Sequence, residues 1–142
     1  MANRKPKQTT RPGVDSLGRT PLHYAAADAN KEEILRLLNE GADPKAKDDN
    51  GWSPLHFATQ SNVQSIVALL VEAGAEVDST DLNGNTPLSR AVFSSKGNGE
   101  LIQYLREAGA DPLKANNYGV SPLSLARQIA NYDIATFFSD LP

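Results

Sequence analysis

The chain has 142 residues, 39% apolar and 22% charged, a size that accommodates one domain or a short repeat array and excludes two substantial domains. It contains no cysteine, which excludes disulfides, cysteine metal sites and thiol catalysis. No window approaches the roughly 18 apolar residues that a membrane-spanning helix needs, and the first residues lack the apolar run of a signal peptide. We therefore expect a cytoplasmic protein with no membrane partner.

The net charge of −3 conceals an uneven distribution along the chain. Residues 1–14 contain no acidic side chain and four basic ones, at Arg4, Lys5, Lys7 and Arg11, and are predicted to form a flexible basic N-terminal arm. Residues 15–142 then hold 10 basic and 17 acidic side chains, a net charge of −7. Because nucleic-acid affinity depends largely on neutralising phosphates, this acidic body disfavours a nucleic-acid partner and favours a basic protein.

A phrase of six residues recurs four times, at spacings of 33, 33 and 35 residues. Its copies are Gly18-Arg19-Thr20-Pro21-Leu22-His23, Gly51-Trp52-Ser53-Pro54-Leu55-His56, Gly84-Asn85-Thr86-Pro87-Leu88-Ser89 and Gly119-Val120-Ser121-Pro122-Leu123-Ser124. A second phrase of glycine, alanine and an acidic residue follows in step at Gly41, Gly74 and Gly109. Two phrases that recur in register indicate a repeat array.

Each copy of the first phrase predicts the start of a helix. The Thr or Ser hydroxyl caps a free backbone N–H, and proline suits the first helical position because its missing N–H would have had no partner there. A second helix is predicted in each unit from apolar residues at helical spacing within residues 34–38, 66–70, 101–105 and 134–138. Glycine then ends this helix, and a turn rich in Asp, Asn and Gly leads to the next unit.

This unit of turn, helix, antiparallel helix and finger resembles the ankyrin repeat family. The family signature Thr-Pro-Leu-His-x-Ala is matched by Thr20-Pro21-Leu22-His23-Tyr24-Ala25, and the resemblance covers about residues 15–142. It implies an all-α solenoid of four helix-turn-helix repeats with short β-hairpin-like fingers. The repeats are expected at about residues 15–47, 48–80, 81–115 and 116–142.

Three departures from the repeat predict local differences. An extra residue before the second helix of the first repeat predicts that residues 31–33 are displaced relative to the other repeats. Two extra residues between Ser94 and Gly99 predict a protruding loop in the third repeat. The fourth repeat ends without a further finger and is predicted to act as the C-terminal cap.

The sequence contains no convincing catalytic, cofactor or metal constellation. His23 and His56 occupy one site in successive repeats, and the resemblance implies that each ring bonds to the capping hydroxyl and to backbone of the neighbouring loop. A metal or small-ligand site that uses both rings remains an alternative, although no third ligand recurs beside them. The carboxylates Asp48, Asp49, Asp78 and Asp81 lie near turns, where Asp is favoured for local backbone bonding rather than as a paired acid.

The resemblance implies that residues flanking the finger glycine and late in the first helix contact a partner protein. We expect these contacts at Leu17, Arg19, Asp49, Asn50, Trp52, Leu82, Asn83, Asn85, Arg90, Phe93, Tyr118 and Val120. Trp52 is the only tryptophan, and Trp and Arg are enriched among interface hot spots. Two alternatives are that Trp52 packs against its neighbouring finger and that Phe93 fills a gap under the loop of the third repeat. That loop is also an alternative contact surface.

We therefore predict a non-catalytic module, monomeric when free, that holds a folded partner protein on an aromatic and Arg cluster inside an acidic rim. The small acidic chain is similar to ankyrin proteins that act as bacterial immunity proteins by neutralising a cognate toxin, and a basic toxin or effector domain would suit its charge. Alternatives are a scaffold or assembly chaperone, and a small-ligand or metal-binding protein that uses His23 and His56.

Overall fold

The computed structural model describes residues 12–129 and 133–142, so nearly all of the predicted N-terminal arm lies outside the described residues. The helices come in pairs, each pair belonging to one repeat. They are α1 (Pro21–Ala27) and α2 (Lys31–Asn39), α3 (Pro54–Ser61) and α4 (Gln64–Glu72), α5 (Pro87–Ser94) and α6 (Glu100–Glu107), and α7 (Pro122–Gln128) with the 3₁₀ helix η1 (Ile134–Phe138).

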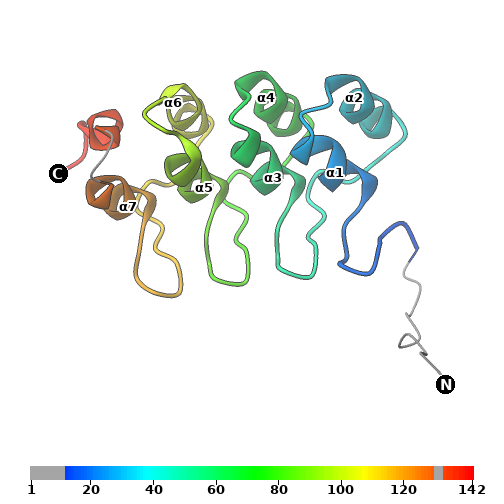
Figure 1. Ribbon diagram of the computed structural model, residues 1–142, viewed down its shortest axis with the longest axis horizontal. Helices are drawn as coiled ribbons and strands as arrows, with labels where there is room; N and C mark the ends of the chain where they lie inside the picture. Colours follow the sequence, from blue (N-terminus) through cyan, green and yellow to red (C-terminus); the bar gives the residue numbers. More distant parts are fainter. Residues whose placement is uncertain (1–11, 130–132) are drawn as a thin grey trace.

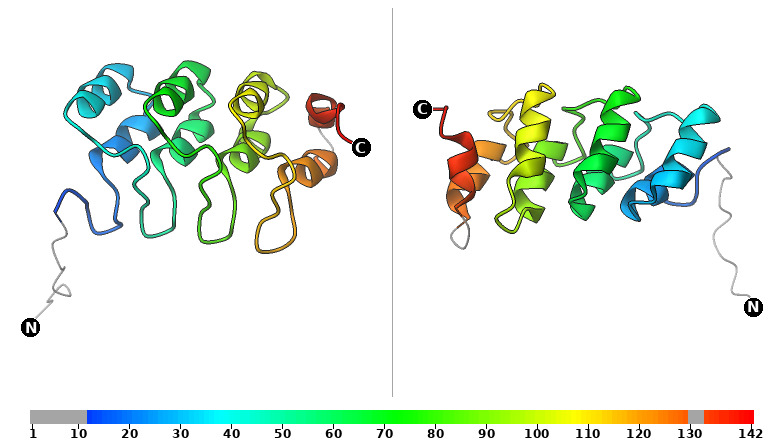
Figure 2. Two further views of the ribbon diagram at one scale, coloured as in Figure 1. Left: turned by 180° about the vertical axis from the view of Figure 1, so that it is seen from behind. Right: turned by 90° about the horizontal axis from the view of Figure 1, so that it is seen from above.

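The repeats stack side by side in two helical layers (Figures 1 and 2). The first helices α1, α3, α5 and α7 pack on one another in chain order, and the second helices lie above them, away from the fingers. The fingers are hairpin-like in shape, but no β-strand occurs among residues 12–129 and 133–142. The predicted all-α solenoid is confirmed.

The helix starts follow the predicted capping chemistry. Thr20, Ser53, Thr86 and Ser121 are extended N-cap residues, and each side chain accepts a hydrogen bond from the backbone N–H three residues later. The prolines occupy the first helical turn. This local signal places every first helix in the same position within its repeat, so the leucines after the prolines become the buried centre of the stack, at Leu22, Leu55, Leu88 and Leu123.

The predicted displacement of residues 31–33 is wrong. The helix α2 begins at Lys31 and α4 begins at Gln64, so the two start 33 residues apart, as the repeat requires. The prediction aligned Ile34 with Ile66, whereas the observed helix starts align Ile34 with Val67. The Ile34 and Val67 side chains are both fully buried. Ile66 is an additional buried residue of the second repeat. Because it is apolar and precedes Val67, the apolar pattern places the start of the second helix of this repeat one residue too early.

The inserted residues of the third repeat form the turn between α5 and α6. Lys96 and Gly97 have φ values of 50° and 92°, and the two ends of the turn are held by the buried residues Ser95 and Gly99. A Cβ atom on Gly99 would lie 2.2 Å from the Phe137 ring, which packs directly on this glycine. The loop is therefore tied to the C-terminal element η1.

The fourth repeat has a short 3₁₀ helix where the others have an α-helix. Ile134 and Phe138 bury their side chains, and Arg106 of α6 donates to the Phe137 carbonyl at 2.9 Å and binds both carboxylate oxygens of Asp140 at 2.7 Å. These contacts hold η1 against the third repeat. The longest helices within the described parts of the chain have nine residues, and none is long and apolar enough to cross a membrane.

Candidate functional site

Each finger is closed by the side chain at its first position. Asp15, Asp48, Asp81 and Asn116 each use Oδ1 to accept hydrogen bonds from the backbone N–H groups two and four residues later, at 2.8–3.0 Å. Asp48 and Asp81 are buried in this role. The interpretation of these two carboxylates as local backbone partners is confirmed.

Neighbouring fingers are also joined to one another. The backbone N–H groups of Asp49, Leu82 and Asn117 donate to the carbonyls of Leu17, Asn50 and Asn83, at 2.9, 3.0 and 2.9 Å. These bonds link each finger to the next across a separation of about one repeat. The four fingers therefore form one continuous hydrogen-bonded row, which we call the comb. The side chains on it are held in a fixed arrangement.

The two histidines connect the helices to this comb. His56 Nδ1 lies 3.1 Å from the Ser53 backbone nitrogen, which donates to it, and Nε2 lies 3.0 Å from the Asn85 carbonyl of the next finger. His23 repeats this pattern with Thr20 and Trp52, at 2.9 Å for both bonds. The partners assign the proton to Nε2 in each ring. The implied structural role is confirmed, and neither ring has a nitrogen left to bind a metal.

Burial lowers the pKa of both imidazoles below the ordinary value of 6.5. Near and below pH 6.5 the unfolded chain therefore takes up protons at these two rings that the folded chain does not, so their contribution to the free energy of unfolding is full above this pH and is lost as the pH falls. Urea denaturation at several pH values measures this. The His23→Ser, His56→Ser double variant, which copies the serines of the later repeats, should show a shallower slope; an unchanged slope would contradict the assignment.

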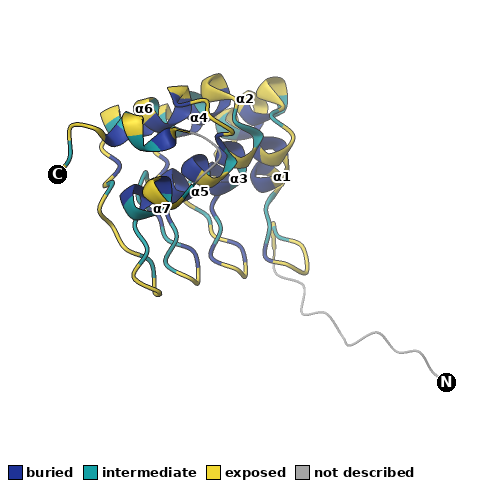
Figure 3. Cartoon of the chain, turned by 60° about the vertical axis from the view of Figure 1, so that its left-hand side comes forward, coloured by how far each residue is buried: buried dark blue, intermediate teal, exposed yellow. Residues whose placement is uncertain are grey.

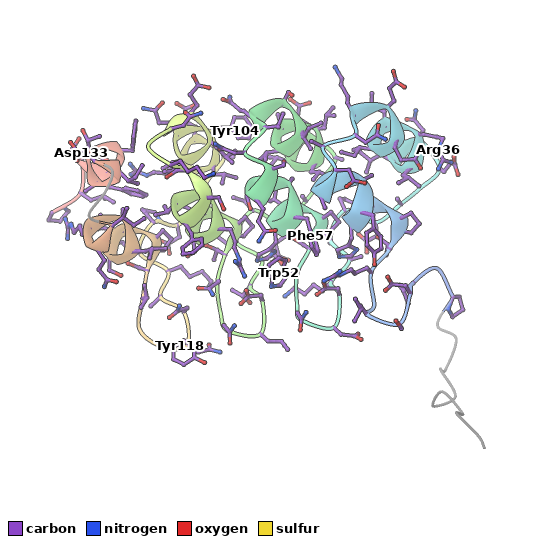
Figure 4. All side chains as sticks on the ribbon, viewed as in Figure 1. Arg36, Trp52, Phe57, Tyr104, Tyr118 and Asp133 are labelled. Carbon is purple, nitrogen blue, oxygen red and sulfur yellow. The ribbon has the colours of Figure 1, made fainter. Side chains whose placement is uncertain are left out.

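A stack of two arginines and two aromatic rings runs between the first helices and the fingers, and Figure 4 labels its two rings, Trp52 and Phe57. The Arg19 guanidinium lies 5.1 Å from the Phe57 ring centre, the Phe57 and Trp52 rings are 5.0 Å apart, and the Arg90 guanidinium lies 4.0 Å from the Trp52 ring. We call these four residues the arginine–aromatic stack. It crosses three repeats, so it exists only because the repeats are stacked in register.

Each arginine of the stack faces a buried carboxylate, but the two pairs differ. Arg19 Nε lies 3.3 Å from Asp48 Oδ2 and donates to it. The closest approach of Arg90 to Asp81 Oδ2 is 3.9 Å, which is too long for a hydrogen bond. Burial lowers the pKa of Arg90, while the Asp81 charge opposes this shift.

Trp52 is half-buried, with its ring against Phe57, His56 and Arg90. It therefore packs within the molecule and is also partly exposed to solvent. Phe57 was not predicted as part of the site. The available signal was its position in the helix, which matches Tyr24, Arg90 and Leu125 in the other repeats and so faces the same row of fingers.

A hollow of about 350 Å³ lies next to the stack, between the third and fourth repeats. It is lined by the predicted site residues Asn85, Arg90, Phe93, Tyr118 and Val120, together with Ser89, Asn116, Leu125 and Gln128. Phe93 is 71% exposed and Tyr118 is 76% exposed. The alternative that Phe93 fills a gap under the neighbouring loop is therefore wrong.

The other predicted residues lie along the fingers. Leu17, Asn50, Leu82 and Asn83 are in the turns, with Leu17 and Leu82 exposed to 47% and 68%, and Asp49 and Asn50 are exposed as well. Figure 3 shows the exposed turns below a largely buried layer of first helices. We call the fingers, the arginine–aromatic stack and the hollow together the finger face.

The finger face carries charges of both signs, with Arg19 and Arg90 beside Asp15, Asp48, Asp49 and Asp81. Further exposed acidic residues lie on the second helices, away from the fingers, at Glu32, Glu72, Glu100 and Glu107. No group of three or more His, Cys, Asp and Glu residues that could hold a metal ion occurs in the part of the chain that the structure describes.

The comparison with protein-family models decides the family. The model for ankyrin repeats in three copies matches residues 3–81 and, in a second placement, residues 22–116. The chain belongs to the ankyrin repeat family. An ankyrin repeat domain is a non-catalytic protein-interaction module, so the predicted class of function, binding without catalysis, is confirmed at this level.

Three curated proteins match a short segment of the chain. Oxysterol-binding protein-related protein 1 of rat, mouse and human is each 56% identical over 36 residues, which is 25% of this chain and 4% of the relative. The chain thus matches a very small part of these proteins, about the length of one ankyrin repeat.

Proposed function

We propose that the chain binds a folded partner protein through its finger face, as a monomer when free. The observation that carries the proposal is the arginine–aromatic stack beside a hollow rimmed by Phe93 and Tyr118. Large exposed aromatic side chains next to a half-buried tryptophan and arginine have the composition of an interface hot spot.

The comb of joined fingers supports binding with little backbone rearrangement. The finger-to-finger hydrogen bonds and the histidine bridges fix the face before a partner arrives, so little ordering entropy is lost on association.

Substitution of Trp52 by alanine is expected to weaken the complex by about 2 kcal/mol or more, because it removes the centre of the finger face. Calorimetry with the partner measures the loss. Circular dichroism of the free variant checks the fold, since Trp52 also packs on Phe57 and Arg90. The matched control is Leu35→Ala on α2, which removes an exposed apolar side chain from the opposite layer and should leave affinity unchanged. Equal affinities of the wild type and the Trp52 variant would remove Trp52 from the interface.

We further propose that the partner is a basic toxin or effector domain, which the chain neutralises as an immunity protein. The acidic surplus supports this, because the net charge of −7 over residues 15–142 would accelerate encounter with a basic protein. The test is co-expression with the product of the adjacent gene. A complex and protection from toxicity are expected; a complex that leaves the activity of the partner intact would instead indicate a scaffold or assembly chaperone.

A further inference from the structure

We propose that the hollow between the third and fourth repeats binds a glutamate or aspartate side chain of the partner, followed in the partner by an apolar residue that packs on Phe93 and Tyr118. The inference rests on the proposed binding through the finger face, and it adds the chemistry of one contact at its centre.

The first observation is an arginine without hydrogen-bond partners. The Arg90 guanidinium carbon lies over the Trp52 ring, 4.0 Å from its centre, and the guanidinium makes no hydrogen bond within residues 12–129 and 133–142. Its side chain is 24% exposed and lines the hollow. A planar guanidinium with free N–H groups matches the two oxygens of a carboxylate, and its position on Trp52 means that little side-chain entropy is lost on binding.

The second observation is the charge around this arginine. Among the described residues that line the hollow, Arg90 is the only charged one, and the other polar side chains there are amides and the hydroxyls of Ser89 and Tyr118. The Asp81 carboxylate lies behind it, 1% exposed, with Oδ2 buried at 3.9 Å from the guanidinium and without a hydrogen bond. The pair is too widely separated to satisfy itself, so the N–H groups of Arg90 that face the hollow remain available to an incoming anion.

The comparison with Arg19 shows that the arrangement at Arg90 is specific. Arg19 also lies over an aromatic ring, but its Nε donates to Asp48, so the protein already supplies its carboxylate. Arg90 has the ring without the hydrogen bond.

The size and rim of the hollow favour a protein side chain over a free phosphate group. A volume of about 350 Å³ exceeds that of one carboxylate, and the exposed Phe93 and Tyr118 rings offer apolar contact beside the arginine. Phosphate groups are usually held by clusters of arginines, and the hollow has one. An acidic residue followed by an apolar one uses both features.

Trp52 is the only tryptophan and lies directly under Arg90, so its fluorescence reports on the hollow without a label. The probes are the blocked peptides acetyl-Gly-Glu-Phe-Gly-amide and acetyl-Gly-Gln-Phe-Gly-amide, and inorganic phosphate. We expect the Glu peptide to change the fluorescence and to bind about tenfold more tightly than the Gln peptide. Arg90→Gln should abolish that preference, and Arg36→Gln on the outer helix α2, away from the finger face, should retain it. Shifts of the Asn85 and Asn116 side-chain amide NMR signals in the wild-type protein give a second readout that needs no variant.

Three results would overturn the proposal. They are equal binding of the two peptides or no response to either, a preference for Glu that survives Arg90→Gln, and phosphate binding that exceeds binding of the Glu peptide. No partner protein enters this experiment. Its failure is therefore separate from failure of the proposed function, which calorimetry of the Trp52→Ala variant with the partner tests.

Discussion

Replacement of Gly51 by alanine is expected to lower the free energy of unfolding by about 3–4 kcal/mol, whereas the same change at Gly119 should cost about 1–2 kcal/mol. Both glycines have φ near +80°, so both variants carry the strain of a left-handed alanine. Their surroundings differ. A Cβ on Gly51 would lie 2.9 Å from Asp81 Cα and from the Leu82 backbone nitrogen in the next finger, whereas a Cβ on Gly119 meets nothing within 4 Å.

Urea denaturation followed by circular dichroism measures both variants. The difference between them isolates the contact of one finger with the next, because the conformational strain is common to both. Similar losses at the two positions would mean that the fingers tolerate separation, and the comb could not then be the rigid element on which binding depends.

His56→Ala is expected to lose about 3 kcal/mol of stability at pH 7.5. The ring is fully buried, and its removal leaves the Ser53 N–H and the Asn85 carbonyl without their partner and opens a cavity between repeats. The control is Ser124→Ala at the same repeat position. Ser124 bonds within its own helix start, so about 1 kcal/mol should be lost there. Equal losses, measured by urea denaturation, would contradict a role of His56 in joining repeats.

The third repeat shows how the connection is made where histidine is absent. Ser89 cannot reach the next finger as His23 and His56 do. The fourth finger instead uses amides, with Asn116 Nδ2 donating to Asn85 Oδ1 and Asn117 Nδ2 donating to the Leu82 carbonyl, both at 2.9 Å. The change from His to Ser therefore replaces one connection between repeats by another.

The helix starts, the finger turns and the histidine bonds could be predicted because they depend on residues close in sequence or on the repeat itself. A Thr-Pro pair such as Thr20-Pro21 favours a helix start through local contacts alone. The phase of the second helices was harder to predict, since Ile34 and Ile66 are both apolar and only the three-dimensional register distinguishes them.

An aromatic and Arg cluster was predicted from the sequence, but the place of Phe57 in it and the geometry of the arginine–aromatic stack were not. Arg19 and Phe57 belong to different repeats and different elements, and their contact depends on the direction of two long side chains. The sequence identified Trp52 and Arg90 separately. That Arg90 lies over Trp52, and that its charge is left without a hydrogen bond, depends on the stacked structure.

The central claim is that the partner binds the finger face. Site-specific photo-crosslinking tests it most directly, with the photoreactive residue p-benzoylphenylalanine placed either at Tyr118, 76% exposed on the fourth finger, or at Arg36 on the outer helix α2. In lysate of the source cells, we predict a discrete crosslinked partner from position 118 and none from position 36. A partner captured from position 36 and not from position 118 would contradict the account.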